Sequence, residues 1–353
     1  MRDEIIQSKL FSQINLSDPF FDSLRNSYPG FDEWFLRKAN ESAYVVISDR
    51  GEIQAFLYLK VENGTIKDID PPLNTSTCLK VGTFKINAKG TRLGERFVKK
   101  IFDHAIVNNI KYVYVTVFEE HEILISILKR YGFFDYGTKT SLGGVEKVFL
   151  KDFNKVSGNT LVDYPVIDSR ATSKWLLAIY PEWHTRLFPD SILRTEDTSI
   201  IKDISHTNSI HKIYIAWMKD MNQIKGGDTI VIYRTKEEGK SAEYSAVATS
   251  LCVVEDINPG TSFTSESDFT NYCKNYSVFT EDELKTFFKS KRSQLYAIKM
   301  TYNIALPKRP TRNRLIEEVG LPRDGYWGLM KLTKQNFNDI ITIGGVYGGL
   351  VID

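Results

Sequence analysis

The chain has few of the residues that build metal centres or disulfide scaffolds. Its 353 residues include three cysteines and five histidines. Cys78, Cys252 and Cys273 form an odd, widely spaced set without metal-ligand spacing. Such a set fits a reducing compartment better than a disulfide framework. The sequence therefore predicts no metal site and a cytoplasmic location.

Long apolar runs and a dominant charge are also lacking. No stretch approaches the roughly 20 apolar residues of a membrane-spanning helix, and the N-terminal residues MRDEIIQSKLFSQ lack the apolar core of a signal peptide. The formal net charge is only +2, which excludes a global attraction to nucleic acid or acidic membranes. We expect no membrane partner, and any basic surface must be local.

The length and composition predict two globular domains. Hydrophobic residues make up 42% and charged residues 25% of the chain, so each half can bury a core. A stretch rich in Ser, Asn, Gly, Asp and Pro interrupts the periodic pattern. We predict a first domain over 1–153, a linker over 154–171 and a second domain over 172–353.

The first domain has a mixed α/β pattern. Tyr44–Ser48 and Gln54–Val61 flank an Asp-Arg-Gly turn, as a hairpin does. Apolar residues at helical spacing follow the third and fourth strands. The pattern predicts an α/β (α+β) domain with a mixed sheet, with helices over 2–14, 18–27, 94–108 and 122–131 and further strands over 77–86 and 112–118.

The second domain is dominated by strands and is predicted to be an α+β domain curled into a small barrel. Two segments with polar caps, 267–275 and 280–289, have helical spacing. The predicted strands are 174–179, 211–217, 229–234, 244–254, 295–302 and 326–332.

A possible anion site lies between the third strand and the following helix. The segment Lys89-Gly90-Thr91-Arg92-Leu93-Gly94 offers two glycines, two cations and a helix start, where backbone N–H groups and the helix dipole favour negative charge. Glycine also lets phosphate oxygens come close to the backbone. On its own, the spacing is more typical of turn and cap glycines.

Residues 1–150 resemble the GNAT acetyltransferase superfamily, because two motifs occur in the same order as in that family. That family's cofactor loop has the form Gln/Arg-x-x-Gly-x-Gly/Ala. Here Lys89 stands first, Arg92 replaces the middle glycine and Gly94 stands last. The strand Tyr112–Phe118, the following helix and Gly132-Phe133 are similar to the family's downstream strand, helix and Gly-Phe ending.

The resemblance implies that acetyl-CoA binds between the strand ending at Ile86 and the strand Tyr112–Val117, without a metal. Its pantetheine amides would pair with the first strand as an extra strand would, and its pyrophosphate would lie at the loop. The cofactor-binding residues so implied are Val81, Thr83, Phe84, Lys85, Ile86, Lys89, Gly90, Thr91, Arg92, Leu93 and Gly94.

The catalytic residues depart from the family pattern. A tyrosine that protonates the thiolate in many members is replaced by Leu128, so water, Tyr112 or Tyr114 could serve instead. Glu119, Glu120 and His121 follow the second cofactor strand and are the candidates for the base. The alternative is that these residues only favour the helix start through its dipole.

The second domain resembles PUA-like domains of the ASCH and EVE type, which commonly bind RNA or modified bases. The resemblance is based on the Gly226-Gly227-Asp228 turn, the strand after it and the strand order; the ASCH signature Gly-x-Lys-x-x-x-Glu-x-Arg is not visible. A loop with Lys308, Arg309, Arg312 and Arg314 is the candidate nucleic-acid contact. A solvated basic face is the alternative.

Three hypotheses follow. The first is an acetyl-CoA-dependent N-acyltransferase for an amine, linked to RNA such as tRNA or aminoacyl-tRNA through the second domain. The second is a non-catalytic protein that binds coenzyme A and nucleic acid as a sensor. The third is an acetyltransferase for a protein or small amine, with the second domain as adaptor. The sequence leaves the oligomeric state open.

Overall fold

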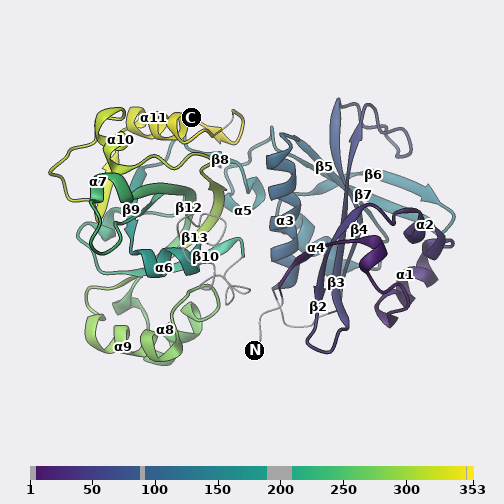
Figure 1. Ribbon diagram of the computed structural model, residues 1–353, viewed down its shortest axis with the longest axis horizontal. Coiled ribbons are helices and arrows are strands. Elements are labelled where there is room, and N and C mark those ends of the chain that lie inside the picture. Colours follow the sequence, from purple (N-terminus) through teal and green to yellow (C-terminus); the bar gives the residue numbers. More distant parts are fainter. Residues whose placement is uncertain (1–4, 88–91, 189–208, 347) are drawn as a thin grey trace. The chain divides into compact units, whose positions relative to one another are not determined.

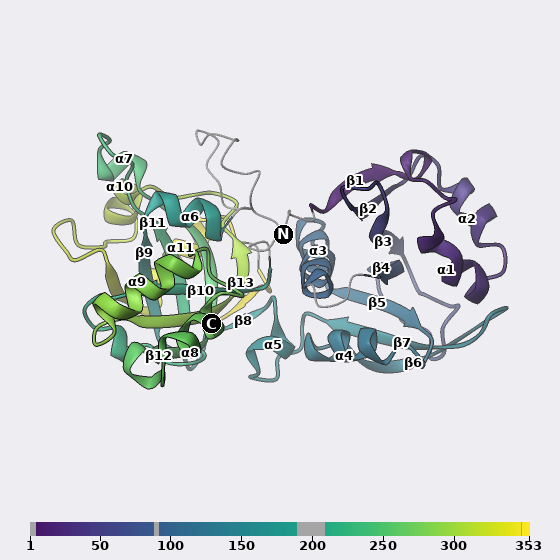
Figure 2. The ribbon, with the colours of Figure 1, turned by 90° about the horizontal axis from the view of Figure 1, so that it is seen from below.

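A computed structural model describes residues 5–87, 92–188, 209–346 and 348–353. The chain divides into two compact units, unit 1 over Met1–Lys155 and unit 2 over Val156–Asp353, and each is considered by itself (Figures 1 and 2). None of the helices in the described ranges combines the length and the hydropathy that crossing a membrane requires.

Unit 1 is built on a seven-stranded sheet with the order β1-β2-β3-β4-β5-β7-β6. Neighbouring strands are antiparallel except β4 and β5, which are parallel and joined through α3. The elements are β1 (Gln7–Leu10), α1 (Asp22–Ser27), α2 (Phe31–Arg37), β2 (Ser42–Ile47), β3 (Ile53–Asn63), β4 (Thr77–Ile86), α3 (Leu93–Val107), β5 (Tyr112–Val117), α4 (Glu122–Arg130), β6 (Phe134–Ser141) and β7 (Gly144–Asp152).

Helices cover both faces of this sheet. Helices α1 and α2 lie on the face opposite to α3 (Figures 1 and 2). They pack on β2 and β3 through an aromatic cluster that includes Phe11, Phe21, Phe35 and Phe56, in which Phe11 and Phe35 meet edge to face at 4.7 Å between ring centroids. Such pairs add to the free energy of area burial.

The predicted helix over 2–14 is wrong for residues 7–13. Gln7–Leu10 form the edge strand β1, which pairs antiparallel with β2, and Phe11–Gln13 form a 3₁₀ turn. A helix this short is marginal without a packed face. Strand pairing satisfies the backbone instead, and the 3₁₀ turn buries Phe11 to 1% exposure.

Unit 2 has a six-stranded sheet with the order β10-β13-β12-β11-β9-β14 and a two-stranded sheet of β8 and β15. Its elements are α5 (Thr160–Asp163), β8 (Ile167–Asp168), β9 (Lys174–Ile179), α6 (Pro181–Leu187), β10 (His211–Ala216), β11 (Thr229–Arg234), α7 (Ala242–Ser245), β12 (Val247–Pro259), α8 (Glu266–Cys273), α9 (Glu281–Lys291), β13 (Tyr296–Ala305), α10 (Arg312–Glu317), β14 (Leu329–Leu332), α11 (Lys334–Ile343) and β15 (Val351–Ile352).

Each predicted strand of unit 2 has a counterpart, but Tyr244 and Ser245, predicted as strand, belong to helix α7, and β12 begins at Val247. The predicted barrel is not closed. Closure needs a continuous ladder between the two edge strands. In the part of the chain that the structure describes, β10 and β14 stand at opposite edges without such a ladder. Strand β14 has only four residues, all paired with β9. The sheet is therefore mixed and open.

Residues 156–171 of the predicted linker lie within unit 2. Its polar residues are turn and cap residues. Asp163 accepts hydrogen bonds from the Ser157 amide at 2.7 Å and the Gly158 amide at 2.8 Å, and Asn159 caps α5. The segment also buries Tyr164 completely, so it is anchored in the unit.

The Gly-Gly-Asp turn before β11 has a structural role. The buried Asp228 carboxylate accepts hydrogen bonds from the Ser173 amide at 3.1 Å, the Trp175 indole at 2.8 Å and the Lys225 amide at 3.0 Å. Gly227 has a positive φ of 88°, which glycine adopts without strain. The turn thus fixes the start of β9 against β11.

Candidate functional site

The parallel ladder between β4 and β5 stops before either strand ends. Three residue pairs join these strands, and the last is Val81 with Val115. Strand β4 continues to Ile86, paired only with β3 among the described residues. Strand β5 continues to Val117 and pairs there with β7. We call the stretch beyond Val81 and Val115 the β4–β5 split.

Backbone groups of β4 face this split. The Asn87 amide donates to the Gln54 carbonyl at 2.9 Å, and the antiparallel register pairs Ile86 with Ala55. Hydrogen-bonded and non-hydrogen-bonded pairs alternate along such a ladder. The backbone groups of Phe84 and Ile86 therefore point away from β3 and toward the split, where they can bind amide groups of an extended ligand.

A β-bulge lies where the split begins. The register of β3 and β4 shifts between Tyr58 and Leu59, which pair with Thr83 and Val81, so Gly82 is the extra residue. A Cβ atom on Gly82 would lie 2.6 Å from the Tyr58 ring, so the close approach of that ring requires glycine. Bulges bend a strand and increase its twist, which turns β4 away from β5.

The start of α3 follows β4. Arg92 occupies the N-cap position, and Leu93 and Gly94 open the helix with Glu95 in its first turn. Amides in the first turn of a helix have no carbonyl partner within that helix, and the helix dipole favours an anion there. The predicted residues Lys89, Gly90 and Thr91 lie outside the described residues.

The predicted cofactor residues on β4 differ in position. Val81 closes the paired part of the ladder and is buried, while Phe84 and Ile86 face the split with their backbones. Lys85 reaches the other side of the sheet, where its ammonium group donates to the Ser23 hydroxyl at 2.6 Å. Burial lowers the pKa of Lys85.

The three candidate base residues lie between β5 and α4 and are exposed. Glu119 forms an ion pair with Lys147 at 2.5 Å. His121 occupies the N-cap position of α4 without a side-chain cap hydrogen bond. Glu120 acts electrostatically on Tyr28, whose pKa is raised by burial, by Glu146 and by Glu120. The catalytic roles of Glu119, Glu120 and His121 stay predictions.

The tyrosines considered as acids differ in position. Leu128 and Tyr131 are both fully buried, so α4 brings no exposed phenol to the split from these positions. Tyr114 belongs to the paired part of β5 and donates to Glu62 at 2.5 Å. Burial and that hydrogen bond raise the pKa of Tyr114, which keeps its proton at neutral pH.

A group of residues that sequence reasoning missed lies at the far end of β5. Tyr28, in the turn between α1 and α2, stacks at a tilt on Phe118 with 5.4 Å between ring centroids. Glu146 of β7 is 4% exposed. No local motif marks these residues, because they meet only through the sheet; a carboxylate inside an alternating strand is the one signal that could have found Glu146.

The basic segment of unit 2 is partly helical and partly neutralised. The predicted loop contains the start of α10, capped by Thr311. Arg314 forms two contacts with Glu318, at 2.5 and 2.7 Å, and the Arg312 guanidinium lies 4.5 Å from the centre of the Trp327 ring. Lys308 is exposed and Arg309 half-buried. Their predicted nucleic-acid contact stays a prediction.

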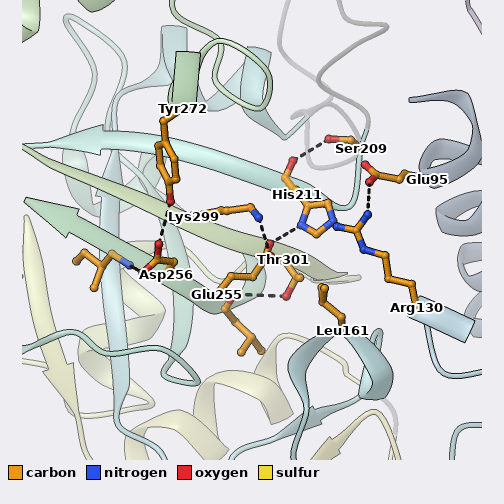
Figure 3. A network of polar contacts seen from close by, with 12 residues as sticks. Glu95, Arg130, Leu161, Ser209, His211, Glu255, Asp256, Tyr272, Lys299 and Thr301 are labelled. Atoms are coloured by element: carbon orange, nitrogen blue, oxygen red, sulfur yellow. Dashed lines mark hydrogen bonds and ion pairs between the residues drawn. The ribbon is translucent and has the colours of Figure 1, made fainter. Parts of the chain in front are cut away.

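A charged network spans three strands of unit 2 (Figure 3). His211 Nδ1 of β10 lies 2.5 Å from Glu255 of β12, whose other oxygen lies 3.1 Å from Lys299 of β13. Burial tends to raise the pKa of Glu255, but the hydrogen bond and charge of His211 and the charge of Lys299 hold it below its usual value. The network is a compensated charge cluster within the sheet.

His184 of α6 is a buried neutral imidazole. Its Nε2 lies 2.8 Å from the Thr249 hydroxyl, and Nδ1 has no hydrogen-bond partner among the described residues. Burial, and then the charges of Arg234 and Arg309, lower the pKa of His184 to about 3. The imidazole is therefore uncharged at neutral pH.

Unit 2 should lose stability in acid because of His184. Between pH 6.5 and 3 the unfolded chain binds a proton on this histidine that the folded chain does not, so stability falls as the pH falls. The free energy of unfolding, measured by urea denaturation, should depend more steeply on pH in wild type than in His184→Gln, which keeps a polar atom near Nε2. In this window the two slopes should differ by about 1.4 kcal/mol per pH unit. Equal slopes would contradict the assignment.

In the part of the chain that the structure describes, no three His, Cys, Asp or Glu side chains gather in a way that could hold a metal ion. Cys78, Cys252 and Cys273 are buried free thiols. Burial raises the pKa of Cys78 to about 12, so this thiol is not activated.

No protein-family model matches the chain, and no curated protein matches it. Solved structures give partial likenesses. The ASCH protein from Zymomonas mobilis is 10% identical, with 48% of this chain and 94% of that chain covered and a TM-score of 0.33. A GNAT-family acetyltransferase from Streptococcus agalactiae is 15% identical, with 44% and 99% covered and a TM-score of 0.31.

Arabidopsis thaliana NAA60 in complex with acetyl-CoA is 17% identical, with 42% of this chain and 99% of that chain covered and a TM-score of 0.30. All three TM-scores lie below 0.5. None of these likenesses decides the function of the chain.

Proposed function

We propose that unit 1 is an acetyl-CoA-dependent N-acyltransferase that acts on an amine. The observation that carries the proposal is the β4–β5 split, where a parallel ladder ends at Val81 and Val115 while both strands continue. The split exposes backbone groups of β4 to an extended ligand, and the start of α3 follows the same strand. These features together suit a long ligand with amide groups and a phosphate end.

The residues of the chain fit such a ligand. Phe84 and Ile86 would bind the pantetheine amides through their backbones, because those groups point away from β3. Arg92, Leu93 and Gly94 would hold the pyrophosphate at the start of α3. Gly82 keeps the strand bent at the point of divergence. When bound, acetyl-CoA supplies an acyl group activated as a thioester.

The transfer joins the amine nitrogen to the acyl carbon and breaks the bond between that carbon and sulfur. The amine loses one proton before it attacks. After the attack the nitrogen loses a second proton and the sulfur gains one, so that coenzyme A leaves as the thiol. The chain's contribution would be orientation of the two reactants and removal of the first proton. Glu120 and Glu146 are the carboxylates linked electrostatically to Tyr28 at the end of β5.

A second candidate is a protein that binds coenzyme A without turnover. The buried Leu128, in the position of the tyrosine of many GNAT proteins, favours this alternative, since no phenol replaces it on α4. In either form, we propose that unit 2 is a PUA-like module that binds RNA. This part of the proposal is based only on the sequence resemblance of unit 2 and on its basic residues Lys308, Arg309, Arg312 and Arg314.

Transfer of labelled acetyl groups from acetyl-CoA by the full chain tests the proposal. We expect label in an amine acceptor when total tRNA, a lysine peptide and a polyamine are offered in parallel. Label in tRNA alone would support the RNA-linked form, and label in peptide or polyamine alone would reject it. Binding of acetyl-CoA without transfer to any acceptor would favour the sensor.

A further inference from the structure

Lys80 of β4 has no carboxylate at ion-pair distance. Its side chain forms no ion pair within 4.0 Å with any residue of the described ranges. The two carboxylates that act on it electrostatically have closer partners. Glu62 binds the Lys60 ammonium group at 2.9 Å, and Asp68 binds that of Lys139 at 2.5 Å. Lys80 therefore lacks the close partner that normally favours the charged form of a lysine.

A second lysine lies beside Lys80. Lys139 of β6 acts on it through its charge and through a hydrogen bond between the two side chains. An ammonium group has no lone pair, so one of the two nitrogens must be an uncharged amine that accepts this bond. Burial tends to lower the pKa of Lys139, but the hydrogen bond and charge of Asp68 raise it above its usual value. Lys139 thus keeps its proton, and Lys80 is the acceptor.

The surroundings of Lys80 favour the same uncharged form. Burial and then the charge of Lys139 lower the pKa of Lys80, against the opposing charges of Glu62 and Asp68. At neutral pH the uncharged amine is therefore more populated at Lys80 than at an exposed lysine. Only this form has the electron pair with which an amine attacks a carbonyl carbon.

Lys80 lies where the β4–β5 split begins. It pairs with Tyr114 in the parallel ladder, and the next pair, Val81 with Val115, is the last. The Lys80 Nζ atom lies 5.5 Å from the centre of the Tyr114 ring, so the side chain lies along the seam between the two strands. A ligand with its phosphate end at the start of α3, beyond Ile86, would have its acyl end toward this seam.

We propose that Lys80 itself accepts an acyl group from acetyl-CoA, so that the chain acetylates its own side chain. This inference rests on the proposed function of unit 1. The uncharged Nζ atom attacks the thioester carbon, a bond forms between nitrogen and the acyl carbon, and the bond between that carbon and sulfur breaks. One proton passes from the nitrogen to the sulfur, so the products are acetylated Lys80 and coenzyme A as the thiol. The pair of lysines then keeps the single charge of Lys139.

Incubation of the full chain with acetyl-CoA, followed by mass mapping of its peptides, tests the inference. Lys80 should gain an acetyl group faster than exposed lysines such as Lys67 and Lys236. Excess coenzyme A competes for the split and should slow the reaction at Lys80 alone. Acetyl phosphate has no pantetheine chain to enter the split, so the preference for Lys80 should disappear with this donor.

Lys139→Gln tests the role of the neighbouring lysine, with Lys67→Gln as the matched control because Lys67 is exposed. Loss of the Lys139 charge, which also frees Asp68, raises the pKa of Lys80. Acetylation of Lys80 at pH 7 should slow by about fivefold or more, as expected for loss of one unit charge nearby, and Lys67→Gln should react as wild type does. As the pH rises toward the ordinary pKa of lysine, the rates of wild type and Lys139→Gln should converge, which a damaged fold would not produce.

Three results would overturn the inference. Lys80 could react no faster than Lys67, it could react at the same rate in excess coenzyme A, or Lys139→Gln could react as fast as wild type at pH 7. Saturable binding of acetyl-CoA by calorimetry without acetylation of Lys80 would also overturn the inference and leave the proposed function standing. Absence of acetyl-CoA binding in wild type would instead overturn the proposed function.

Discussion

Phe84→Pro should weaken the binding of acetyl-CoA to the full chain about fivefold, measured by calorimetry. Proline removes the one amide hydrogen that points from Phe84 toward the split, and a hydrogen bond contributes about 1 kcal/mol, which is about fivefold in affinity. The bond lost is not part of the β3–β4 ladder, because the groups of Phe84 point away from β3. Proline is tolerated on such a strand edge.

Phe84→Ala is the matched control. The Phe84 ring packs against Phe97 at 5.8 Å between centroids, and both variants lose that contact. Only the proline variant also loses the amide hydrogen. The difference in affinity between the two variants therefore reports the backbone contact, and equal affinities would show that the ligand does not pair with this edge of β4.

Arg92→Glu should weaken acetyl-CoA binding by about tenfold or more, because a positive group at the N-cap of α3 becomes negative. Coulomb energies near a protein surface amount to about 1–4 kcal/mol for unit charges 4 Å apart, and the helix dipole adds to the attraction of an anion there. Binding by wild type should weaken as salt is added, and binding by the variant should depend on salt less.

Arg50→Glu changes the net charge equally but lies in the exposed turn between β2 and β3. Its effect on affinity at physiological salt should be small, since a Debye length of about 8 Å screens distant surface charges. If the two charge reversals weakened binding to the same extent, the pyrophosphate would not lie at the start of α3.

The alternation of apolar residues predicted most strands, because burial on one or two faces leaves a direct trace in the sequence. The strand predicted over 229–234 is β11 with the same bounds, and the helix predicted over 280–289 is α9 with a capping box at Thr280. The segment Gln7–Leu10 was predicted wrongly, because its strand form depends on pairing with Ser42–Val45, which local patterns do not encode.

The sequence likewise predicted one part of the candidate site and missed another. The order of strands and glycines around β4 and α3 is local, and it indicated where to look for a phosphate site. The β4–β5 split depends on which strands pair and where the ladder ends, so only the register shows it. Glu146, Tyr28 and Phe118 come from three distant segments, and their proximity is a property of the sheet and its turns rather than of any motif.

The linker and the barrel show that amino-acid composition alone does not predict how a segment pairs or packs. Ser157, Gly158 and Asn159 were predicted to belong to a linker, but the first two donate to Asp163 and the third caps a helix. The six strands of the large sheet of unit 2 could be predicted, but β8, β15 and the open form of the sheet could not, because they depend on pairing between segments distant in the sequence. Strand β14, with four residues, leaves its edge open.

Hydrogen exchange of the full chain with and without acetyl-CoA tests the central claim most directly. If the ligand pairs with the free edge of β4, the amides of Phe84 and Ile86 should exchange more slowly when it is added, while amides of the ladder between β2 and β3 should change little. Saturable binding without added protection over residues 82–86, or no binding at all, would contradict the claim.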